Sequence, residues 1–316
     1  MGKTSIQWSE HSWNPVRGCS RVSEGCRNCY AERMVARGLP GLNSPTTGEP
    51  FAIRTPSGPR WTGEVELIES ALDIPLRRRK PTTWFVNSMS DLFHESLPDE
   101  AIDRVMAVTI LSDRHRSTPR NHTMQVLTKR AARAQSYMSD PETPYRVGSW
   151  VTSMVIKGWR PAKGGLDWNP IKPWPPENLW LGVSVEDRAH KNRIDSLRQT
   201  PAAVRFLSLE PLLEDIGDLD LTGIHQVIIG GESGPGARPF DVAWPRSIIR
   251  QCRAAKVAAF VKQVGARAFD GFSLHRQIHH RSTDGRLYLK LKDHKGGDPS
   301  EWPEDLRVRE MPGSGS

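Results

Sequence analysis

Three of the four cysteines lie close together near the start of the chain, at Cys19, Cys26 and Cys29. Six residues separate the first pair and two residues separate the second pair. In a reducing cytosol such a group favours metal binding over disulfide formation. Gly18 and Gly25 each precede a cysteine and would let the backbone fold tightly around a ligand. These residues predict an inorganic cofactor site, and with it an enzyme.

The spacing leaves two kinds of metal site open. Structural zinc uses four ligands, usually in two pairs, whereas this loop has a single C-x-x-C pair and His11 as its nearest histidine. Three thiolates suit a four-iron cluster that leaves one iron open for catalysis. Asn28 is expected to cap a short helix ending near Gly38, whose N-terminus would favour the thiolate form of the cysteines.

The fourth cysteine, Cys252, stands apart in an expected helix over residues 245–256. Its apolar neighbours Ile248 and Ile249 indicate that it packs as a small buried hydrophobic residue. The alternative is a fourth ligand or a hydrogen-atom donor to a substrate.

Short apolar runs alternate with longer amphipathic stretches through the middle and end of the chain. Runs of this length and β-branched content are typical of strands buried on both faces, as in a parallel sheet. The expected strands cover residues 84–86, 124–127, 179–185, 204–209, 227–229 and 257–261. Expected helices begin near residue 96 and cover residues 186–199 and 245–256. The alternation predicts an α/β fold, either a barrel or a doubly wound sheet.

Polar residues follow each of these six runs, at the point where a strand would end. In parallel α/β folds the ligand site lies at the carboxyl ends of the strands. We therefore expect one polar site there, although polar residues also begin loops and cap helices for structural reasons. The candidates are Ser88, Ser90, Asp91, Lys129, Arg130, Ser184, Glu186, Ser208, Glu210, Gly230, Gly231, Glu232 and Lys262.

The balance of charge is basic. The 316 residues carry a formal charge of +8, with a pI of about 9.5, and include 11 tryptophans. A basic surface attracts polyanions, and exposed aromatic rings stack on bases, so nucleic acid is the expected partner. The run at residues 77–80 and the Trp-rich segment at residues 140–178 would be the docking elements. No apolar stretch approaches about 18 residues, and no secretory signal is present, so we expect a cytoplasmic protein without membrane contact.

Several motifs together resemble one known family. The sequence is similar to the phage-type three-Cys-motif proteins, a family of unknown function that is itself similar to the radical S-adenosylmethionine (SAM) superfamily. The matching stretches are WNPVRGC (13–19), GCRNCYAE (25–32), FVNSMSDLFH (85–94), LTKR (127–130), WLGVSVE (180–186), LSLEPL (207–212) and GGESGPGAR (230–238).

The resemblance implies a partial TIM-like (β/α)₆ barrel with irregular insertions. It implies that Cys19, Cys26 and Cys29 hold a [4Fe–4S] cluster, and that SAM binds its fourth iron and is reductively cleaved to a 5′-deoxyadenosyl radical. The common radical-SAM loop spaces its cysteines by three and two residues, whereas this loop has six and two. The barrel would cover residues 1–265 with the insert at 140–178, followed by an extension at 266–312 and a short tail at 313–316.

Residue roles also follow from the resemblance. Ser88, Ser90 and Asp91 would bind the methionine amine, and Ser184 and Glu186 the ribose or carboxylate region. Gly230, Gly231 and Glu232 would lie against the adenine, with Ser208 and Glu210 as further cofactor contacts. Substrate phosphate would be contacted by Lys129, Arg130, Arg238 and Lys262.

Three functions remain open. The first is radical-SAM-like repair or modification of a base in DNA or RNA. The second is the same chemistry on a protein or a small molecule. The third is a non-enzymatic module that binds nucleic acid and holds zinc. The sequence predicts no oligomeric state.

Overall fold

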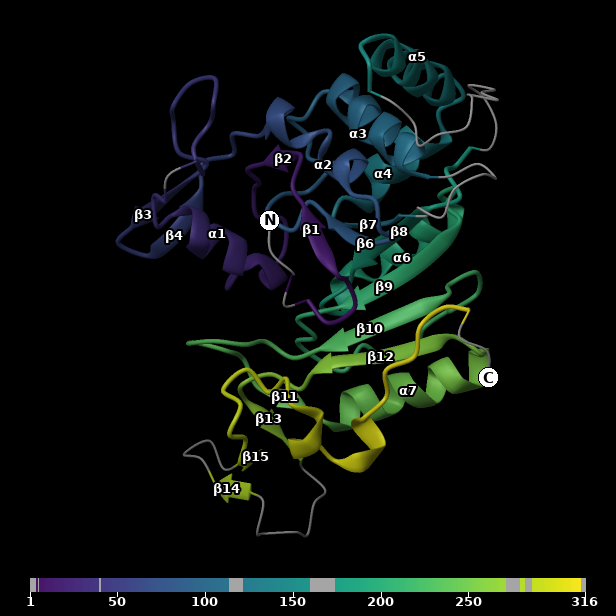
Figure 1. Cartoon of the computed structure of the whole chain (residues 1–316). Helices are drawn as coiled ribbons and strands as arrows, with labels where there is room; N and C mark the ends of the chain where they lie inside the picture. Colours follow the sequence, from purple (N-terminus) through teal and green to yellow (C-terminus); the bar gives the residue numbers. More distant parts are fainter. Residues whose placement is uncertain are drawn as a thin grey trace. The chain divides into compact units, whose positions relative to one another are not determined.

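The computed structural model describes residues 4, 6–39, 41–113, 122–159, 174–270, 279–281 and 286–313. Its main sheet has seven strands in the order β1-β6-β7-β8-β9-β10-β12 (Figure 1). They are β1 (His11–Trp13), β6 (Thr83–Val86), β7 (Thr123–Thr128), β8 (Leu179–Ser184), β9 (Val204–Leu209), β10 (Gln226–Gly230) and β12 (Ala258–Gln263). Spatial order follows chain order, as in a (β/α) barrel. The predicted fold class, a partial TIM-like α/β barrel, is confirmed.

Burial explains why these runs form strands. All five residues of β10 are buried, as expected where both faces of a parallel sheet are covered. Parallel pairing joins β1 to β6, β6 to β7, β9 to β10 and β10 to β12. All six predicted strands are present. The seventh, β1, was missed because His11 and Ser12 interrupt any apolar run.

The chain divides into two compact units. One comprises residues 1–22, 29–182 and 199–204, and is called here the first unit. The second unit comprises residues 23–28, 183–198 and 205–316. The division passes through the cysteine loop, because Cys19 and Cys29 belong to the first unit and Cys26 to the second. The domain boundary predicted at residue 265 stays a prediction.

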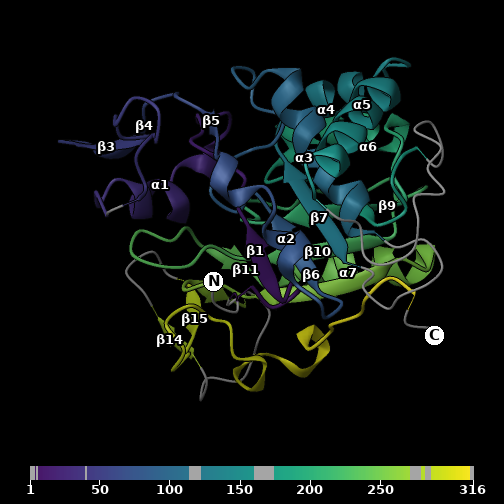
Figure 2. The ribbon, with the colours of Figure 1, turned by 45° about the horizontal axis from the view of Figure 1, so that its top comes forward.

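In the first unit, three helices lie together on one side of β6 and β7 (Figure 2). They are α3 (Asp99–Ser112), α4 (Ala131–Ser139) and α5 (Thr143–Ile156). The helix expected to begin near residue 96 is α3, which begins at Asp99 with Pro98 as its N-cap residue and has two acids in its first turn. The segment at 140–178 begins with α5, a helix that the sequence pattern did not predict. Residues 160–173 of the 140–178 segment, including Trp168, lie outside the described residues.

Smaller elements complete the first unit. Helix α1 (Tyr30–Val35) packs against a hairpin of β3 (Ala52–Thr55) and β4 (Gly58–Trp61) over a small apolar core. The segment at residues 38–63, although rich in Gly, Pro, Ser and Thr, therefore contains a hairpin. The remaining elements are β2 (Val16–Arg17), β5 (Glu66–Leu67) and α2 (Ile74–Arg77).

In the second unit, α7 (Ala243–Ala255) packs against β12. A second sheet has the order β11-β13-β15-β14, formed by β11 (Phe240–Asp241), β13 (Ala268–Phe269), β15 (Leu287–Leu289) and β14 (His279–Arg281). Helices α6 (Asn192–Gln199) and α7 match the two helices predicted after residue 186. Among the described residues, no helix is both long and apolar enough to cross a bilayer.

Candidate functional site

The backbone around Cys19 is fixed by the glycine before it. Gly18 has a φ of +86°, and a Cβ at this position would lie 1.9 Å from the carbonyl oxygen of Glu64. Only glycine fits both constraints. Gly18 also bridges in parallel to Ser90, whose hydroxyl donates to the carbonyl of Val16 at 2.9 Å. The close approach to the Glu64 carbonyl is a sufficient reason for a glycine at this position.

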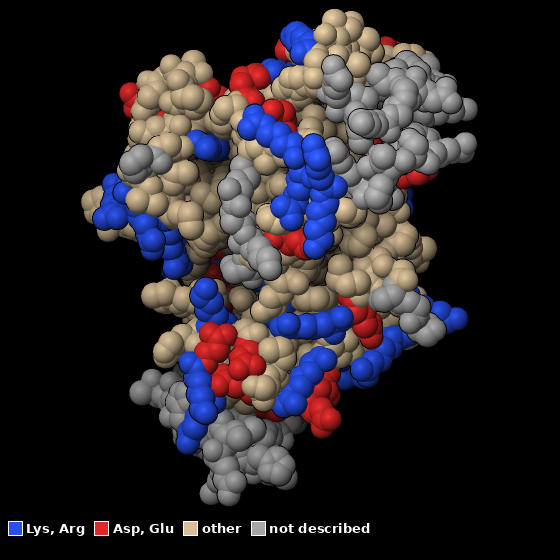
Figure 3. Space-filling view, viewed as in Figure 1, with Lys and Arg blue, Asp and Glu red and all other residues tan. Residues whose placement is uncertain are grey.

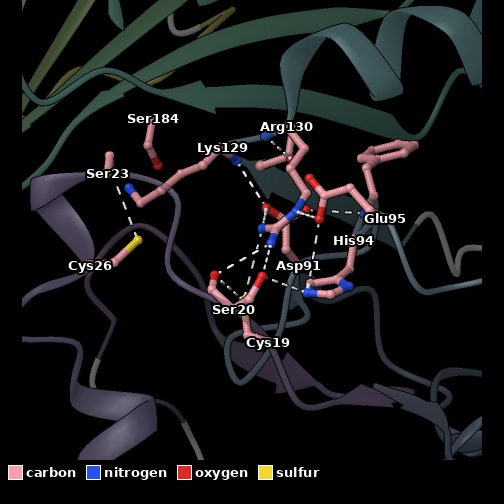
Figure 4. Close-up of polar contacts among 12 residues, drawn as sticks. Cys19, Ser20, Ser23, Cys26, Asp91, His94, Glu95, Lys129, Arg130 and Ser184 are labelled. Atoms are coloured by element: carbon pink, nitrogen blue, oxygen red, sulfur yellow. Dashed lines mark hydrogen bonds and ion pairs between the residues drawn. The ribbon is translucent and has the colours of Figure 1, made fainter. Parts of the chain in front are cut away.

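A buried arginine holds the residues that follow. The Arg130 guanidinium lies 3.9 Å from Cys19 Sγ and donates to the carbonyl and hydroxyl oxygens of Ser20 at 3.3 and 2.8 Å (Figure 4). Its other nitrogens contact Asp91 at 3.2 Å and Glu95 at 2.7 Å. Burial alone would lower the pKa of Arg130, but Asp91, Cys19 and Glu95 raise it above its ordinary value. A permanent positive charge therefore faces the Cys19 sulfur.

The carboxylate of Asp91 is occupied by the protein itself. Its Oδ1 accepts from the Thr128 hydroxyl at 2.6 Å and from the Phe93 N–H at 3.0 Å. Its Oδ2 accepts from the Lys129 N–H at 3.0 Å and from Arg130 at 3.2 Å. A carboxylate offers about four acceptor positions. Asp91 thus orients Arg130 and the start of α4, and these four contacts use the positions predicted for the methionine amine.

His94 and Ser20 form a pair that resembles a nucleophile and its base. His94 Nε2 lies 2.8 Å from Ser20 Oγ. However, His94 Nδ1 accepts the backbone N–H of Ser96 at 3.1 Å, so in the neutral ring Nε2 carries the proton. Burial, followed by the charge of Arg130, lowers the pKa of His94 and keeps the ring neutral. His94 therefore donates to Ser20 and does not activate it as a nucleophile.

Cys29 begins α1 in the first unit. Cys29 itself is the N-cap residue, without a side-chain cap hydrogen bond. The prediction that Asn28 caps this helix was wrong. The buried carboxylate of Glu32, one turn into α1, accepts from Arg21 Nε at 3.0 Å and from the Trp61 N–H at 2.8 Å. The helix, the hairpin and the loop after Cys19 are thereby tied together.

In the second unit, the segment at residues 23–28 carries Cys26 and rests on Glu186. The Glu186 side chain is fully buried, and its two oxygens accept from Ser23 Oγ and from Arg193, each at 2.8 Å. A Cβ on Gly25 would lie 2.4 Å from the Glu186 carboxylate. Gly25 is therefore required by contact with a buried carboxylate, and its predicted approach to a cofactor is not needed to explain it.

The glycine-rich loop after β10 holds the same segment from a second position. Arg238 donates to the carbonyl of Glu24 at 3.0 Å and pairs with Glu232 at 2.7 Å. Asn28 Nδ2 donates to the carbonyl of Gly236 at 3.2 Å, which is the contact it makes instead of capping α1. Burial would raise the pKa of Glu232, but hydrogen bonds from Arg238 lower it below its usual value. Glu232 is therefore an ionised partner of Arg238.

The other predicted site residues have varied surroundings. The hydroxyl of Ser88 donates to the side chain of Asn14 at 3.1 Å. Ser184 and Ser208 are buried on the neighbouring strands β8 and β9. Lys262 pairs with Glu210 at 2.5 Å.

The glycines after β10 also have structural roles. A Cβ on Gly231 would lie 2.4 Å from the Val264 carbonyl oxygen, whereas one on Gly230 would meet the Glu210 side chain at 3.2 Å. Gly231 therefore allows two backbone segments to meet, which is sufficient reason for a glycine there. Gly230 is less tightly constrained.

The three loop cysteines have the chemistry that a cluster requires. None of the four cysteines forms a disulfide, and Cys19, Cys26 and Cys29 are all partly exposed. Among the described residues, no three His, Cys, Asp or Glu side chains are gathered closely enough to hold a metal ion. The thiol donors fit an iron–sulfur cluster by type. Cys252 differs, because it is buried in α7 and burial raises its pKa to about 12.

Several residues of these networks were missed by sequence reasoning. They are Ser20, Ser23, His94, Glu95 and Arg193. Ser20 and Ser23 lie within the cysteine loop and could have been noted for that reason. The contact of Glu95 with Arg130 joins residues 35 apart in the sequence, so no local pattern indicated it. Arg193 lies only seven residues after Glu186, so this pair was within reach of a local pattern.

Comparison with known proteins places the chain in a family. A family described as "Protein of unknown function (DUF5131)" matches residues 3–292, so the chain belongs to it. No curated protein matches the chain. Among solved structures, a mutant of spore photoproduct lyase is similar at 11% identity and a TM-score of 0.37, covering 93% of this chain and 72% of the lyase chain. A second mutant of that lyase, with bound AdoMet and dinucleoside spore photoproduct, has 11% identity, a TM-score of 0.36 and the same coverage.

Proposed function

We propose that the protein is a radical-SAM-like enzyme in which Cys19, Cys26 and Cys29 ligate a [4Fe–4S] cluster. The observation that carries the proposal is the set of paired charged side chains that hold two of the three cysteine-bearing segments in place. Arg130 faces Cys19, while Glu186 and the Arg238–Glu232 pair hold the segment that carries Cys26. Burying charged groups costs free energy unless they are paired, and here the pairs fix a short irregular loop.

Different residues of the chain would act on the cluster and on SAM. A cluster held by Cys19, Cys26 and Cys29 would supply the electron for reductive cleavage of SAM to a 5′-deoxyadenosyl radical, the species that would take hydrogen from the substrate. Arg130 places a positive charge beside a ligating sulfur, and such outer contacts tune iron–sulfur potentials. The buried hydroxyls of Ser184 and Ser208 lie on neighbouring strands, where Val185 N–H donates to the Ser208 carbonyl at 3.0 Å. We assign them, with Glu210 and the backbone of Gly230, to SAM.

Other residues predicted to contact the cofactors would instead support the cysteine loop. Asp91, Glu186 and Glu232 would act on the cofactors through the loop, by holding Arg130 and the Cys26 segment. Ser88, Ser90 and Gly231 would support the same backbone. Lys129 and Lys262 are assigned to substrate phosphate, and the substrate class we propose is nucleic acid. The basic balance of the chain supports this class.

Anaerobic reconstitution with iron and sulfide tests the proposal. The expected product is a brown protein with about four irons per chain, which forms 5′-deoxyadenosine when given dithionite and SAM. Cys26→Ala should lose both properties, whereas Cys252→Ala should keep both because that thiol is buried within α7. Full nucleoside formation by Cys26→Ala would refute the proposal. A colourless protein that binds zinc would indicate a non-enzymatic zinc module instead.

A further inference from the structure

A basic surface without acidic partners lies on α1 and the hairpin that packs against it. In α1 and the turn that follows, Tyr30, Arg33 and Arg37 recur at intervals of three and four residues, so they share one helix face. The opposite face, with Ala31 and Val35, is buried against the hairpin. The outward face is therefore available to a partner.

Arg54 extends this face from the hairpin. In β3, Arg54 alternates with Ile53, so it lies on the side of the hairpin that carries the buried Ala52 and faces α1. Its Nε donates to the carbonyl of Ala36 at 3.1 Å, next to Arg37 in the chain. We call Tyr30, Arg33, Arg37 and Arg54 the basic patch. In Figure 3, Lys and Arg side chains gather over the region of α1, β3 and β4 at the left of the view.

The charge of the basic patch is not neutralised. Among the described residues, none of its three arginines forms an ion pair with a carboxylate, whereas six other arginines of the first unit do. Residues 30–39 and 52–61 contain one carboxylate, Glu32, which is buried and held by Arg21. An arginine surface whose described residues form no carboxylate pairs is electrostatically complementary to a polyanion.

An exposed aromatic ring indicates which class of polyanion binds here, because it favours a nucleic acid over an acidic protein. The Tyr30 side chain is 54% exposed, and its hydroxyl donates to Met89 Sδ at 3.4 Å, which holds the ring in one place. An accessible ring beside guanidinium groups is the arrangement that stacks on bases while neighbouring cations contact phosphates. Acidic proteins would use the charge but not the ring.

We propose that the basic patch docks single-stranded nucleic acid, or an unpaired segment of a duplex, on the surface of α1. Tyr30 directly follows Cys29, a proposed cluster ligand, so the bound strand would pass beside the cysteine loop. The inference rests on the proposed function in one respect: only if the loop holds a cluster would the bound strand lie beside a reactive centre. The binding itself needs neither the cluster nor SAM.

Fluorescence anisotropy of the full-length chain, as purified and after reconstitution, tests the docking. The probes are a labelled single-stranded DNA, an RNA of the same sequence and the matching duplex, titrated between about 50 and 200 mM salt. The variant Arg33→Ala/Arg37→Ala/Arg54→Ala should reduce the slope of log K against log salt by about 2 for single strands. Affinity at about 0.1 M salt should fall by about 100-fold.

A matched control removes the same charge elsewhere. Arg250→Ala/Arg253→Ala/Lys295→Ala takes three exposed basic side chains from the second unit, two of them on α7, and none from α1 or its hairpin. This control should bind within about three-fold of the unaltered chain if the patch carries the contacts. Equal losses in the two triple variants would overturn the proposal, since the attraction would then be diffuse.

Two further results separate the roles of ring and charge. Tyr30→Ala should weaken binding to single strands by about ten-fold and binding to the duplex much less. Arg33→Ala/Arg37→Ala leaves the Arg54 hydrogen bond intact, so it tests the patch even if the triple variant fails to fold. Absence of binding at low salt, or equal affinity for an acidic protein, would overturn the inference. Formation of 5′-deoxyadenosine in that case would leave the proposed cluster and SAM chemistry standing and would remove nucleic acid as the substrate class.

Discussion

The contact between Gly25 and Glu186 makes the sharpest prediction about the cysteine loop. A methyl group at Gly25 would lie 2.4 Å from Glu186 Cγ and Oε1, where apolar contacts normally need about 3.5–4.0 Å. Glu186 cannot move aside easily, because it is fully buried and held by Arg193. Overpacking of this kind costs about 1–3 kcal/mol. If the segment undocks instead, loss of the charged hydrogen bond from Ser23 costs about 1.5–3 kcal/mol.

Thermal unfolding of Gly25→Ala should show this cost directly. A loss of about 1–3 kcal/mol corresponds to a decrease in Tm on the order of 2–6 °C for a chain of this size. Iron uptake by Gly25→Ala on reconstitution should also be lower than that of the unaltered chain, because Cys26 lies next to the altered residue. Gly230→Ala is the matched control, since its Cβ would meet the Glu210 side chain at 3.2 Å, a longer contact than the 2.4 Å at Gly25.

A double-mutant cycle decides whether the clash is the cause. In a Glu186→Ala background the carboxylate is gone, so Gly25→Ala should cost almost nothing further. The coupling between the two changes should be about 1–3 kcal/mol, within the range seen for contacting residues. If Gly25→Ala costs the same in both backgrounds, the reasoning from the close approach is refuted.

Three further predictions concern the buried groups. Arg130→Gln should lower the free energy of unfolding by about 3–5 kcal/mol, because it leaves the Asp91 carboxylate buried without its cation; chemical denaturation measures this. Burial and the charge of Arg130 depress the pKa of His94 in the folded protein. Stability from this group is therefore complete above the unfolded pKa of about 6.5 and is lost as pH falls through the folded value. The urea midpoint should fall less steeply with acid in His94→Gln. Burial raises the pKa of Cys252 to about 12, so in native protein at pH about 8 iodoacetamide should not label it, as mass spectrometry would show.

Each of these has an internal control. Arg133→Gln breaks a partly exposed pair with Asp99 and should change stability by about 1 kcal/mol at most. Equal losses in Arg130→Gln and Arg133→Gln would contradict the buried-pair argument. Identical acid dependence in His94→Gln and the unaltered chain would contradict the pKa assignment. Labelling of Cys252 at the rate of the unfolded chain would show that the thiol is accessible.

The sheet was largely predictable because its strands are covered on both faces. A buried strand needs a continuous apolar run, and such runs are visible in the sequence at β10 and β12. Strand β1 has no such run, since it is three residues long and contains His11 and Ser12. Helix α5 was missed because the whole segment at 140–178 was interpreted from its tryptophans, prolines and glycines. Most of these residues follow the end of the helix.

The interpretation of the strand ends was less complete. Polar residues were expected to face a cofactor, but Asp91 and Glu186 hold neighbouring parts of the chain. The partners of Glu186 include Ser23, which is 163 residues away. No local pattern connects residues at that distance. Gly18 and Gly25 were recognised as tight positions, but the groups that approach them, a backbone carbonyl and a buried carboxylate, are visible only in the structure.

The contact between Ser23 and Glu186 also has a consequence for biosynthesis. Ribosomes add about 5–20 residues per second, so the Glu186 carboxylate emerges roughly 10–30 s after Ser23, which precedes it by 163 residues. During that interval Cys26 has no docking partner, although Cys19 and Cys29 belong to the unit that is made first. Loading of the proposed cluster would therefore have to wait for β8, which makes metal insertion a late event in the life of the nascent chain.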